Sequence, residues 1–291
     1  MRPLEFLTGP ESAGRTVKSV LEGEFEMSSS HISRLKRREG GMLLNGAPCR
    51  VNERLNEGDR LTALISDAPG AVTLEPMEAP LDIVYEDEWL IIVNKSAGVC
   101  VHPERSGAGG SLENALTHYL APGEYVHTVS RLDRGTSGLL TVAKSGYVHE
   151  RMKRIQHTPD FYKEYLGVTV GVPQPEKGFI ALPLAHPAGE NFRMEVKEGG
   201  LACRTEYEVV SVHGGRARVK LVPHTGRMHQ LRAHMAAIGC PLVGDWLYGE
   251  EVPYISHAAL HSAFLRFKHP LTGERMSFSA ELPCEIAALI E

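Results

Sequence analysis

Short apolar runs alternate with stretches of helical periodicity over the C-terminal two thirds of the chain. The runs at residues 83–85, 90–94 and 139–143 predict strands. Between the second and third runs, residues 111–121 place five apolar or aromatic side chains on one helical face, with Ser111 in the N-cap position. Residues 146–156 predict a second helix. Strands and helices are therefore interleaved along this part of the chain, which predicts a mixed fold of both.

Strict alternation of side chains marks the next predicted strand, residues 161–170. It places Lys163 and Tyr165 on one face and the apolar side chains of Leu166, Val168 and Val170 on the other. Residues 205–212 and 216–222 predict a hairpin that turns at two consecutive glycines. Because hairpin signals outnumber clear parallel crossovers, we expect a largely antiparallel sheet.

A well-delimited helix is predicted over residues 225–239, which begin with Thr-Gly and end at a glycine that a proline soon follows. On such a helix Arg227, Leu231 and His234 would share one face. An arginine at a helix N-terminus adds its charge to the free backbone N–H groups, so Arg227 is a candidate for binding a phosphate or a carboxylate. The more ordinary alternative for Arg227 is a surface ion pair.

The N-terminal region has a different pattern and a basic segment. Ile32 and Leu35 would face inward from a short helix, a Gly-Gly break follows, and Asn-Gly and Gly-Asp pairs suggest tight turns between short strands. The predicted helix carries four basic residues, Arg34, Lys36, Arg37 and Arg38. Residues 66–80 contain three prolines and few large apolar side chains. We therefore expect a small domain over residues 1–70, a linker over 71–80 and a large domain over 81–291.

Composition and charge exclude several classes of protein. No apolar run approaches the roughly 20 residues of a membrane helix, and no signal-peptide core is present near the start, so we expect a cytoplasmic protein that does not enter a membrane. The five cysteines are single and unpaired by spacing, which favours reduced thiols over disulfides or a zinc ribbon. The net charge of −5 argues only weakly against nucleic acid, because screening makes local patches decisive.

The segment HTVSRLDRGTSGLL, residues 127–140, contains one carboxylate, Asp133, between Arg131 and Arg134. Nearby positive charge favours the ionised form of an aspartate, so Asp133 would serve as a nucleophile or an electrostatic group rather than as a general acid. Taken alone, however, such a short motif is more typical of a loop that is pinned by ion pairs. Tyr165 and Arg227 are candidate partners in a site, although ordinary strand packing would also explain Tyr165.

His224, His229 and His234 do not predict a metal site. These histidines are five residues apart, so on a helix each is rotated by about 140° from the one before. No suitably placed cysteine or glutamate completes a ligand set. We therefore expect no metal, and the chain contains no dinucleotide or phosphate-binding fingerprint that would imply a cofactor.

Five segments, taken together, resemble the RluA-type RNA pseudouridine synthases. They are NKSAGVCVHP, HTVSRLDRGTSGLLTVAKS, KEYLGVT, HTGRMHQLRAHMAAIGCPLVGDWLYG and ALHSAFLRFKHPLTGE, and they span most of residues 81–291 in the order of that family. The resemblance implies an α+β fold with a long mixed, mainly antiparallel sheet and a central cleft. It implies that Asp133 is the catalytic aspartate, Tyr165 the aromatic residue beneath the target base, and Arg227 the basic residue that pairs with the aspartate.

The N-terminal segment resembles, in degenerate form, a small helix-hairpin RNA-binding domain of ribosomal and RNA-modifying proteins. The expected partner is therefore RNA, with large-subunit ribosomal RNA favoured over transfer RNA, and the expected enzyme is a monomer. Candidate phosphate contacts are Arg34, Lys36, Arg37, Arg38, Arg131, Arg134 and Lys163. Two alternatives stay open at this point, a catalytically silent RNA-binding or assembly factor and a metal-dependent nuclease.

Overall fold

The computed structural model describes residues 3–67, 74–103, 110–121 and 125–291. The first residues of the predicted 71–80 linker therefore lie outside the described part of the chain. Within the described residues, no helix has both the length and the apolar character needed to span a bilayer.

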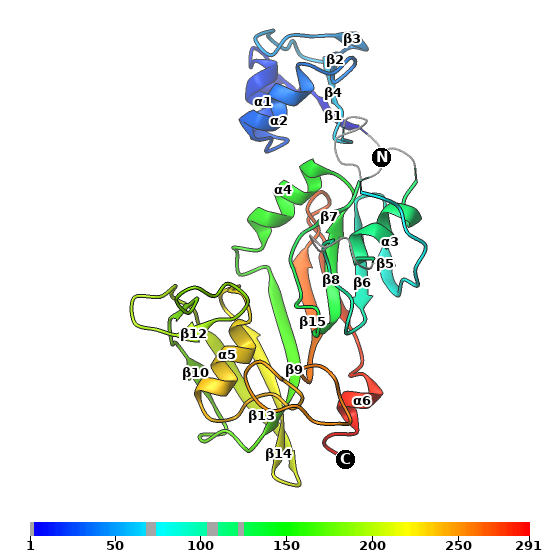
Figure 1. Cartoon of the computed structure of the whole chain (residues 1–291). Coiled ribbons are helices and arrows are strands. Elements are labelled where there is room, and N and C mark those ends of the chain that lie inside the picture. The colour runs from blue at the N-terminus through cyan, green and yellow to red at the C-terminus, as the bar shows by residue number, and fades with distance from the viewer. Residues whose placement is uncertain (1–2, 68–73, 104–109, 122–124) are drawn as a thin grey trace.

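The N-terminal residues form a small unit with its own sheet, seen at the top of Figure 1. Its elements are β1 (Leu4–Leu7), η1 (Pro10–Ser12), α1 (Val17–Gly23), α2 (Ser29–Leu35), β2 (Met42–Leu44), β3 (Ala47–Pro48) and β4 (Arg60–Ala63). The four strands pair in the order β1-β4-β2-β3, all antiparallel. Val17, Val20 and Leu21 of α1 and Ile32 and Leu35 of α2 are buried, as the spacing predicted for α2.

One long sheet organises the rest of the chain. Its strands are β5 (Ile83–Glu86), β6 (Leu90–Lys95), β7 (His127–Thr128), β8 (Ser137–Ala143), β9 (Tyr162–Val170), β10 (Lys177–Ile180), β13 (Thr205–His213), β14 (Arg216–Pro223), β15 (Leu260–Lys268) and β16 (Arg275–Ser279). The main path is β10-β13-β14-β9-β15-β8-β6-β5, in which β8 and β15 run parallel and the other neighbours antiparallel. The predicted α+β, mainly antiparallel sheet is confirmed.

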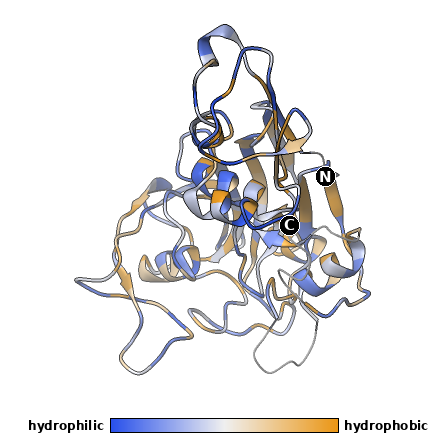
Figure 2. Ribbon diagram, turned by 90° about the horizontal axis from the view of Figure 1, so that it is seen from above, coloured by the Kyte–Doolittle hydropathy of each residue, from blue (hydrophilic) through white to orange (hydrophobic). Residues whose placement is uncertain are grey.

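The remaining elements flank this sheet (Figure 1). They are α3 (Leu112–Tyr119), α4 (Gly146–Ile155), α5 (Gln230–Ala237), α6 (Cys284–Ala287) and a small ribbon of β11 (Leu184–Ala185) and β12 (Glu195–Val196). The N-cap of α3 is Ser111, whose side chain accepts from the backbone N–H of Asn114, as predicted. Hydrophobic residues run along the strands, whereas the peripheral loops carry both hydrophilic and hydrophobic residues (Figure 2).

Burial along β9 differs from the predicted alternation. Tyr165, Val168 and Thr169 are all buried, whereas Val170 at the strand end is exposed. The cause is that β9 lies in the middle of the sheet, where both faces are covered: Tyr165 packs in one hydrophobic cluster and Val168 in another. On β14, which has one strongly buried face, the predicted inward residues Ala217, Val219 and Leu221 are fully buried.

Both functionally interesting helices are shorter than predicted. Helix α2 ends at Leu35, so Lys36, Arg37 and Arg38 lie at its end and in the turn beyond it. Helix α5 begins at Gln230 rather than at Thr225, because His229 adopts a left-handed conformation with φ of 50° and interrupts the helical path.

The small unit contacts α4 of the large one through several polar groups. The Tyr147 hydroxyl donates to the Phe25 carbonyl at 2.5 Å, and the Ser28 hydroxyl donates to the Glu150 carboxylate at 2.7 Å. Arg34 of α2 forms an ion pair with the same Glu150 at 3.3 Å. One of the predicted RNA-contacting arginines therefore faces the large unit in this structure.

Candidate active site

A cavity of about 1000 Å³ opens beside the loop that joins β7 to β8. Its lining comes from segments far apart in sequence: Ser96, Ala97, Gly98, Cys100, Val101, His102, Arg131, Leu132, Asp133, Arg134, Gly135, Thr136, Phe192, Met228, His229, Arg232, Trp246, Leu247, Ser256, His257, Ala258 and Glu285. This volume is at the upper end of the roughly 300–1,000 Å³ of ligand pockets. The cavity can hold a nucleotide, and it surrounds the Asp133 loop that the sequence singled out.

Gly138 lets the strand after this loop approach β15 closely. Its φ is 107°, and a Cβ at this position would lie 2.4–2.5 Å from the backbone O and N of Ser262. A side chain here would push apart the parallel strands β8 and β15. The second glycine of the Gly-Thr-Ser-Gly stretch is therefore required by strand packing directly behind the site.

The Asp133 loop is held against the 95–99 loop by several hydrogen bonds. The Gly98 N–H donates to the Arg134 carbonyl at 2.8 Å, and the Arg134 Nε donates back to the Gly98 carbonyl at 3.0 Å. The buried Lys95 Nζ donates to the carbonyls of Ser96, Val99 and Arg134 at 2.9, 2.8 and 3.2 Å. Burial lowers the pKa of Lys95 to about 8. We infer that Lys95 fixes the loop and does not reach the cavity.

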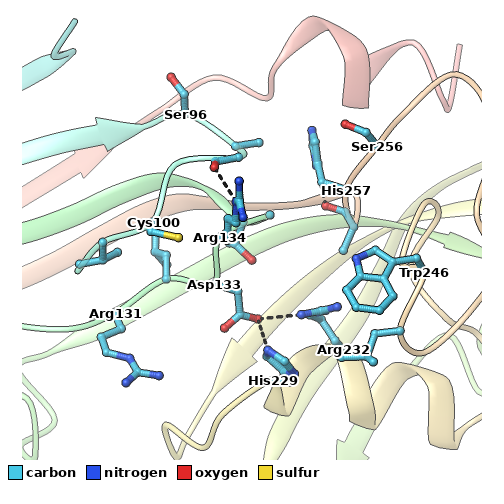
Figure 3. A pocket seen from close by; sticks show the side chains of 18 of the residues that line it. Ser96, Cys100, Arg131, Asp133, Arg134, His229, Arg232, Trp246, Ser256 and His257 are labelled. Carbon is cyan, nitrogen blue, oxygen red and sulfur yellow. Dashed lines mark hydrogen bonds and ion pairs between the residues drawn. The ribbon is translucent and has the colours of Figure 1, made fainter. Parts of the chain in front are cut away.

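Asp133 is held by an arginine that is itself held by a second carboxylate. Arg232 on α5 donates to Asp133 Oδ2 at 3.4 Å (Figure 3). It also binds Asp245 with two bonds of 2.7 Å. Asp245 has no exposed surface, and its carboxylate also accepts from the backbone N–H of Leu247 and Tyr248. Burial opposes the charge of Arg232, but the Asp245 carboxylate raises the pKa of Arg232 above its ordinary value. The cavity therefore contains a permanent cation aimed at Asp133.

His229 approaches the same carboxylate oxygen of Asp133, with Nε2 3.9 Å from Oδ2 (Figure 3). Its Nδ1 lies 3.1 Å from the Tyr248 hydroxyl, which already accepts from the Met194 N–H at 2.7 Å. The Tyr248 hydroxyl can donate to an unprotonated Nδ1 or accept from a protonated one, so this contact holds the ring in place in either tautomer. Burial lowers the pKa of His229, which favours the neutral form of the ring beside Asp133.

Tyr165 lies close enough to Asp133 for the two groups to interact electrostatically. The ring is buried in the same hydrophobic cluster as Leu132 and Leu231, which flank the site in sequence. Burial, and next the charge of Asp133, raise the pKa of Tyr165, so it remains a neutral phenol. Of the three residues that the resemblance implied, Asp133 lines the cavity, and Tyr165 lies near Asp133 without lining the cavity.

Arg227, the third of these residues, is not the partner of Asp133. It precedes α5 and its Nε donates to the Ala202 carbonyl at 3.4 Å, whereas the ion pair with Asp133 belongs to Arg232. The reason is the shorter helix: Gln230 Oε1 accepts from the Arg227 backbone N–H at 3.1 Å and from Thr225 at 2.7 Å, which holds residues 225–229 in a loop. The prediction that Arg227 pairs with the aspartate is wrong.

The structure places the other candidate RNA contacts in three groups. Arg131 and Arg134 are exposed and line the cavity, and Figure 3 shows the Arg131 side chain directed away from Asp133. Lys163 is half-buried on β9 with its Nζ 5.2 Å from the centre of the Phe161 ring, and burial lowers its pKa to about 8. In the N-terminal turn Lys36 and Arg37 are exposed, whereas Arg38 donates to the Ser66 carbonyl at 2.6 Å.

Sequence reasoning missed the residues that complete the site. The segment HTGRMHQLRAHMAAIGCPLVGDWLYG contains all three of them: Arg232, His229 and Asp245. The same segment contains several other basic side chains, and the residue at which the helix begins decides which of them faces Asp133. The histidines do not form a metal site: His234 is buried between Thr205 Oγ1 and the Leu182 carbonyl, both at 2.9 Å. Among the described residues, no group of three potential ligands is close enough to bind a metal ion.

Comparisons with known proteins show the family to which the chain belongs. Residues 89–237 match the family model described as RNA pseudouridylate synthase. The chain belongs to the RNA pseudouridine synthase family. It is 35% identical to an uncharacterized RNA pseudouridine synthase, YjbO, of Bacillus subtilis, over 95% of this chain and 98% of that protein. It is 33% identical to ribosomal large subunit pseudouridine synthase D of Escherichia coli K12, over 86% of this chain and 82% of that protein.

Solved structures support the pseudouridine synthase fold. Human RNA pseudouridylate synthase domain containing 1 is 28% identical, covers 72% of this chain and 86% of its own, and has a TM-score of 0.58. The fold of human RNA pseudouridylate synthase domain containing 4 is also similar, with a TM-score of 0.57 over 71% of this chain and 90% of its own at 23% identity. The enzyme is thus an RNA pseudouridine synthase, and the expected family and fold class are confirmed.

Proposed function

We propose that this RNA pseudouridine synthase converts a uridine of large-subunit ribosomal RNA to pseudouridine, with Asp133 as the catalytic carboxylate. The observation that carries the proposal is the placement of Asp133 in a nucleotide-sized cavity, ion-paired at 3.4 Å to an arginine that a buried carboxylate holds in place. An arginine with this support holds a reacting carboxylate in position while substrate enters.

Pseudouridine formation is an isomerisation. The bond from ribose C1′ to uracil N1 breaks, the base turns, a bond from C1′ to C5 forms, C5 loses its proton and N1 gains one. An ionised Asp133 can act covalently either at the uracil ring or at the ribose. In both routes the ion pair with Arg232 holds the carboxylate oxygen Oδ2 in place, and Nε2 of His229 lies 3.9 Å from the same oxygen. Tyr165 is a buried, neutral aromatic residue near the carboxylate that does not line the cavity, so stacking of the uracil on its ring requires the ring to become accessible when RNA binds.

The ribosomal target is supported by the relative from Escherichia coli, whose name specifies the large ribosomal subunit and which matches this chain over most of both lengths. The test uses unmodified transcripts of large-subunit ribosomal RNA and of transfer RNA, incubated separately with purified enzyme. Pseudouridine is mapped at nucleotide resolution, in parallel with total RNA from a strain that lacks the gene. We expect one or more positions in large-subunit ribosomal RNA that lack pseudouridine in the deletion strain and that the purified enzyme converts to pseudouridine. Modification of transfer RNA alone would overturn the proposed target.

We also propose that the exposed basic turn after α2 contacts RNA phosphate. Arg37→Glu is expected to weaken RNA binding and to reduce the slope of log affinity against log salt by about one, since one phosphate contact is lost. Arg38 is a poorer choice because its guanidinium holds the Ser66 carbonyl. The measurement is RNA affinity by filter binding over a series of salt concentrations.

Lys18→Glu is the matched control for this variant. Lys18 lies on α1 of the same small unit and is exposed, and the substitution changes the charge by the same amount. If Arg37→Glu and Lys18→Glu have the same affinity and salt slope, the turn does not contact RNA.

A further inference from the structure

We propose that Trp246 is a stacking platform for a nucleobase that flanks the target uridine in the bound RNA. The inference adds a specificity-determining residue to the family activity, and it rests on RNA being the substrate but not on which RNA it is. Trp246 lines the cavity that contains Asp133, and 58% of its surface is exposed. Figure 3 shows its indole ring beside Arg232.

Trp246 is a large aromatic side chain that is exposed to solvent, and it is exposed at the cavity that contains Asp133. Large aromatic side chains usually bury most of their surface, and the described part of the chain exposes several large apolar residues at scattered positions. Of these exposed residues, Trp246 and Phe192 line the cavity, and Phe192 is 55% exposed. Two solvent-facing aromatic rings at the opening of an RNA-modifying site are what base stacking requires, because every base presents an aromatic face.

The turn that presents Trp246 is fixed from several sides. Asp245 accepts from the backbone N–H of Leu247 and Tyr248 through its carboxylate, and from Gly249 at 2.7 Å through its carbonyl. Gly244, with φ of 73°, approaches the His257 carbonyl so closely that a Cβ would lie 2.5 Å from that oxygen. Because this turn is already ordered, a base that stacks on the indole does not have to order the backbone first.

The same carboxylate that fixes the turn also sets its position relative to Asp133. Asp245 binds Arg232 with two bonds, and Arg232 binds Asp133, so the indole and the catalytic carboxylate share one rigid support. The target uridine has to reach the Asp133 carboxylate, which is 25% exposed, whereas 58% of the surface of Trp246 is exposed to solvent. The base that reaches Trp246 is therefore a neighbour of the target, and the exposed Arg131 and Arg134 lie where its phosphates can be bound.

The kinetic test measures pseudouridine formation in total RNA from a strain that lacks the gene, which contains the unmodified target whatever its identity. Removing one base stack weakens binding by about 5- to 150-fold. We therefore expect Trp246→Ala to raise the KM for RNA about tenfold or more with kcat within about twofold of the wild type. Trp246→Phe, which keeps an aromatic face, should restore most of the affinity. An unchanged KM for Trp246→Ala, or a fall in kcat alone, would overturn the proposal.

Fluorescence gives an independent readout because the chain has two tryptophans, Trp89 and Trp246. In Trp89→Phe all tryptophan emission comes from Trp246, and a stacked base should quench it when the same RNA is added. In the matched variant Trp246→Phe, the half-buried Trp89 outside the cavity should respond little. Equal responses of the two variants would contradict stacking. If instead Asp133 is not catalytic, Asp133→Asn keeps turnover while the quench is unaffected, so the two failures are distinguishable.

Discussion

Asp133→Asn is expected to lower kcat by more than about a thousandfold while RNA affinity stays close to that of the wild type. Asparagine has nearly the same shape and keeps one oxygen that can accept from Arg232, but it is neutral and cannot serve as a nucleophile or a base. The fold should tolerate the change, because Arg232 keeps both of its bonds to the buried Asp245. Turnover is measured as pseudouridine formed in unmodified RNA, and affinity by filter binding with the same RNA.

Asp160→Asn is the matched control for this experiment. Asp160 is a partly exposed aspartate that pairs with Lys268 at 2.9 Å and does not line the cavity, so its amide should leave turnover unchanged. Retained activity in Asp133→Asn would overturn the assignment of the catalytic carboxylate. A strain carrying Asp133→Ala that behaves as wild type, when the deletion strain does not, would favour an RNA-binding or assembly role that needs no catalysis.

The sequence predicted the overall fold because the main signals are local. The turn at residues 214–215, the cap at Ser111 and the alternation on β14 each depend on neighbouring residues, and the structure contains all of them. Burial on β9 was predicted less well, because it depends on the strand lying between β14 and β15, which only the complete sheet decides. The parallel pairing of β8 with β15 joins residues 124 positions apart, and no short segment encodes it.

The site was predicted in part for a similar reason. The family resemblance of five segments pointed to Asp133 and Tyr165, whereas the short motif around Asp133 alone was more typical of a pinned loop. The arginine was assigned to the wrong position because Arg227 and Arg232 stand five residues apart in one segment and differ only in where the helix begins. Helix α5 starts after His229, whose left-handed backbone conformation interrupts the helical path, and no side chain caps the helix. Asp245, which selects Arg232, lies beyond the helix and becomes relevant only after folding.

Arg232→Ala is therefore expected to abolish detectable turnover and to lower the free energy of unfolding by about 3–5 kcal/mol. The substitution leaves the Asp245 carboxylate, which has no exposed surface, without its cation. It also removes the charge that faces Asp133. Unfolding is measured by urea titration, and turnover at a temperature where the variant is fully folded.

Arg227→Ala is the matched control, because it removes an arginine side chain from an exposed position. The one side-chain hydrogen bond described for Arg227 goes to the Ala202 carbonyl and is 3.4 Å long. It should change stability by less than about 1 kcal/mol, as is typical of surface positions, and should retain turnover. Inactivity of Arg227→Ala alone would reverse the assignment.

To separate catalysis from stability, Arg232→Gln is combined with Asp245→Asn, which makes the buried pair neutral and keeps an acceptor for Leu247 and Tyr248. We expect this double variant to regain much of the stability and none of the activity, because Asp133 still lacks its cation.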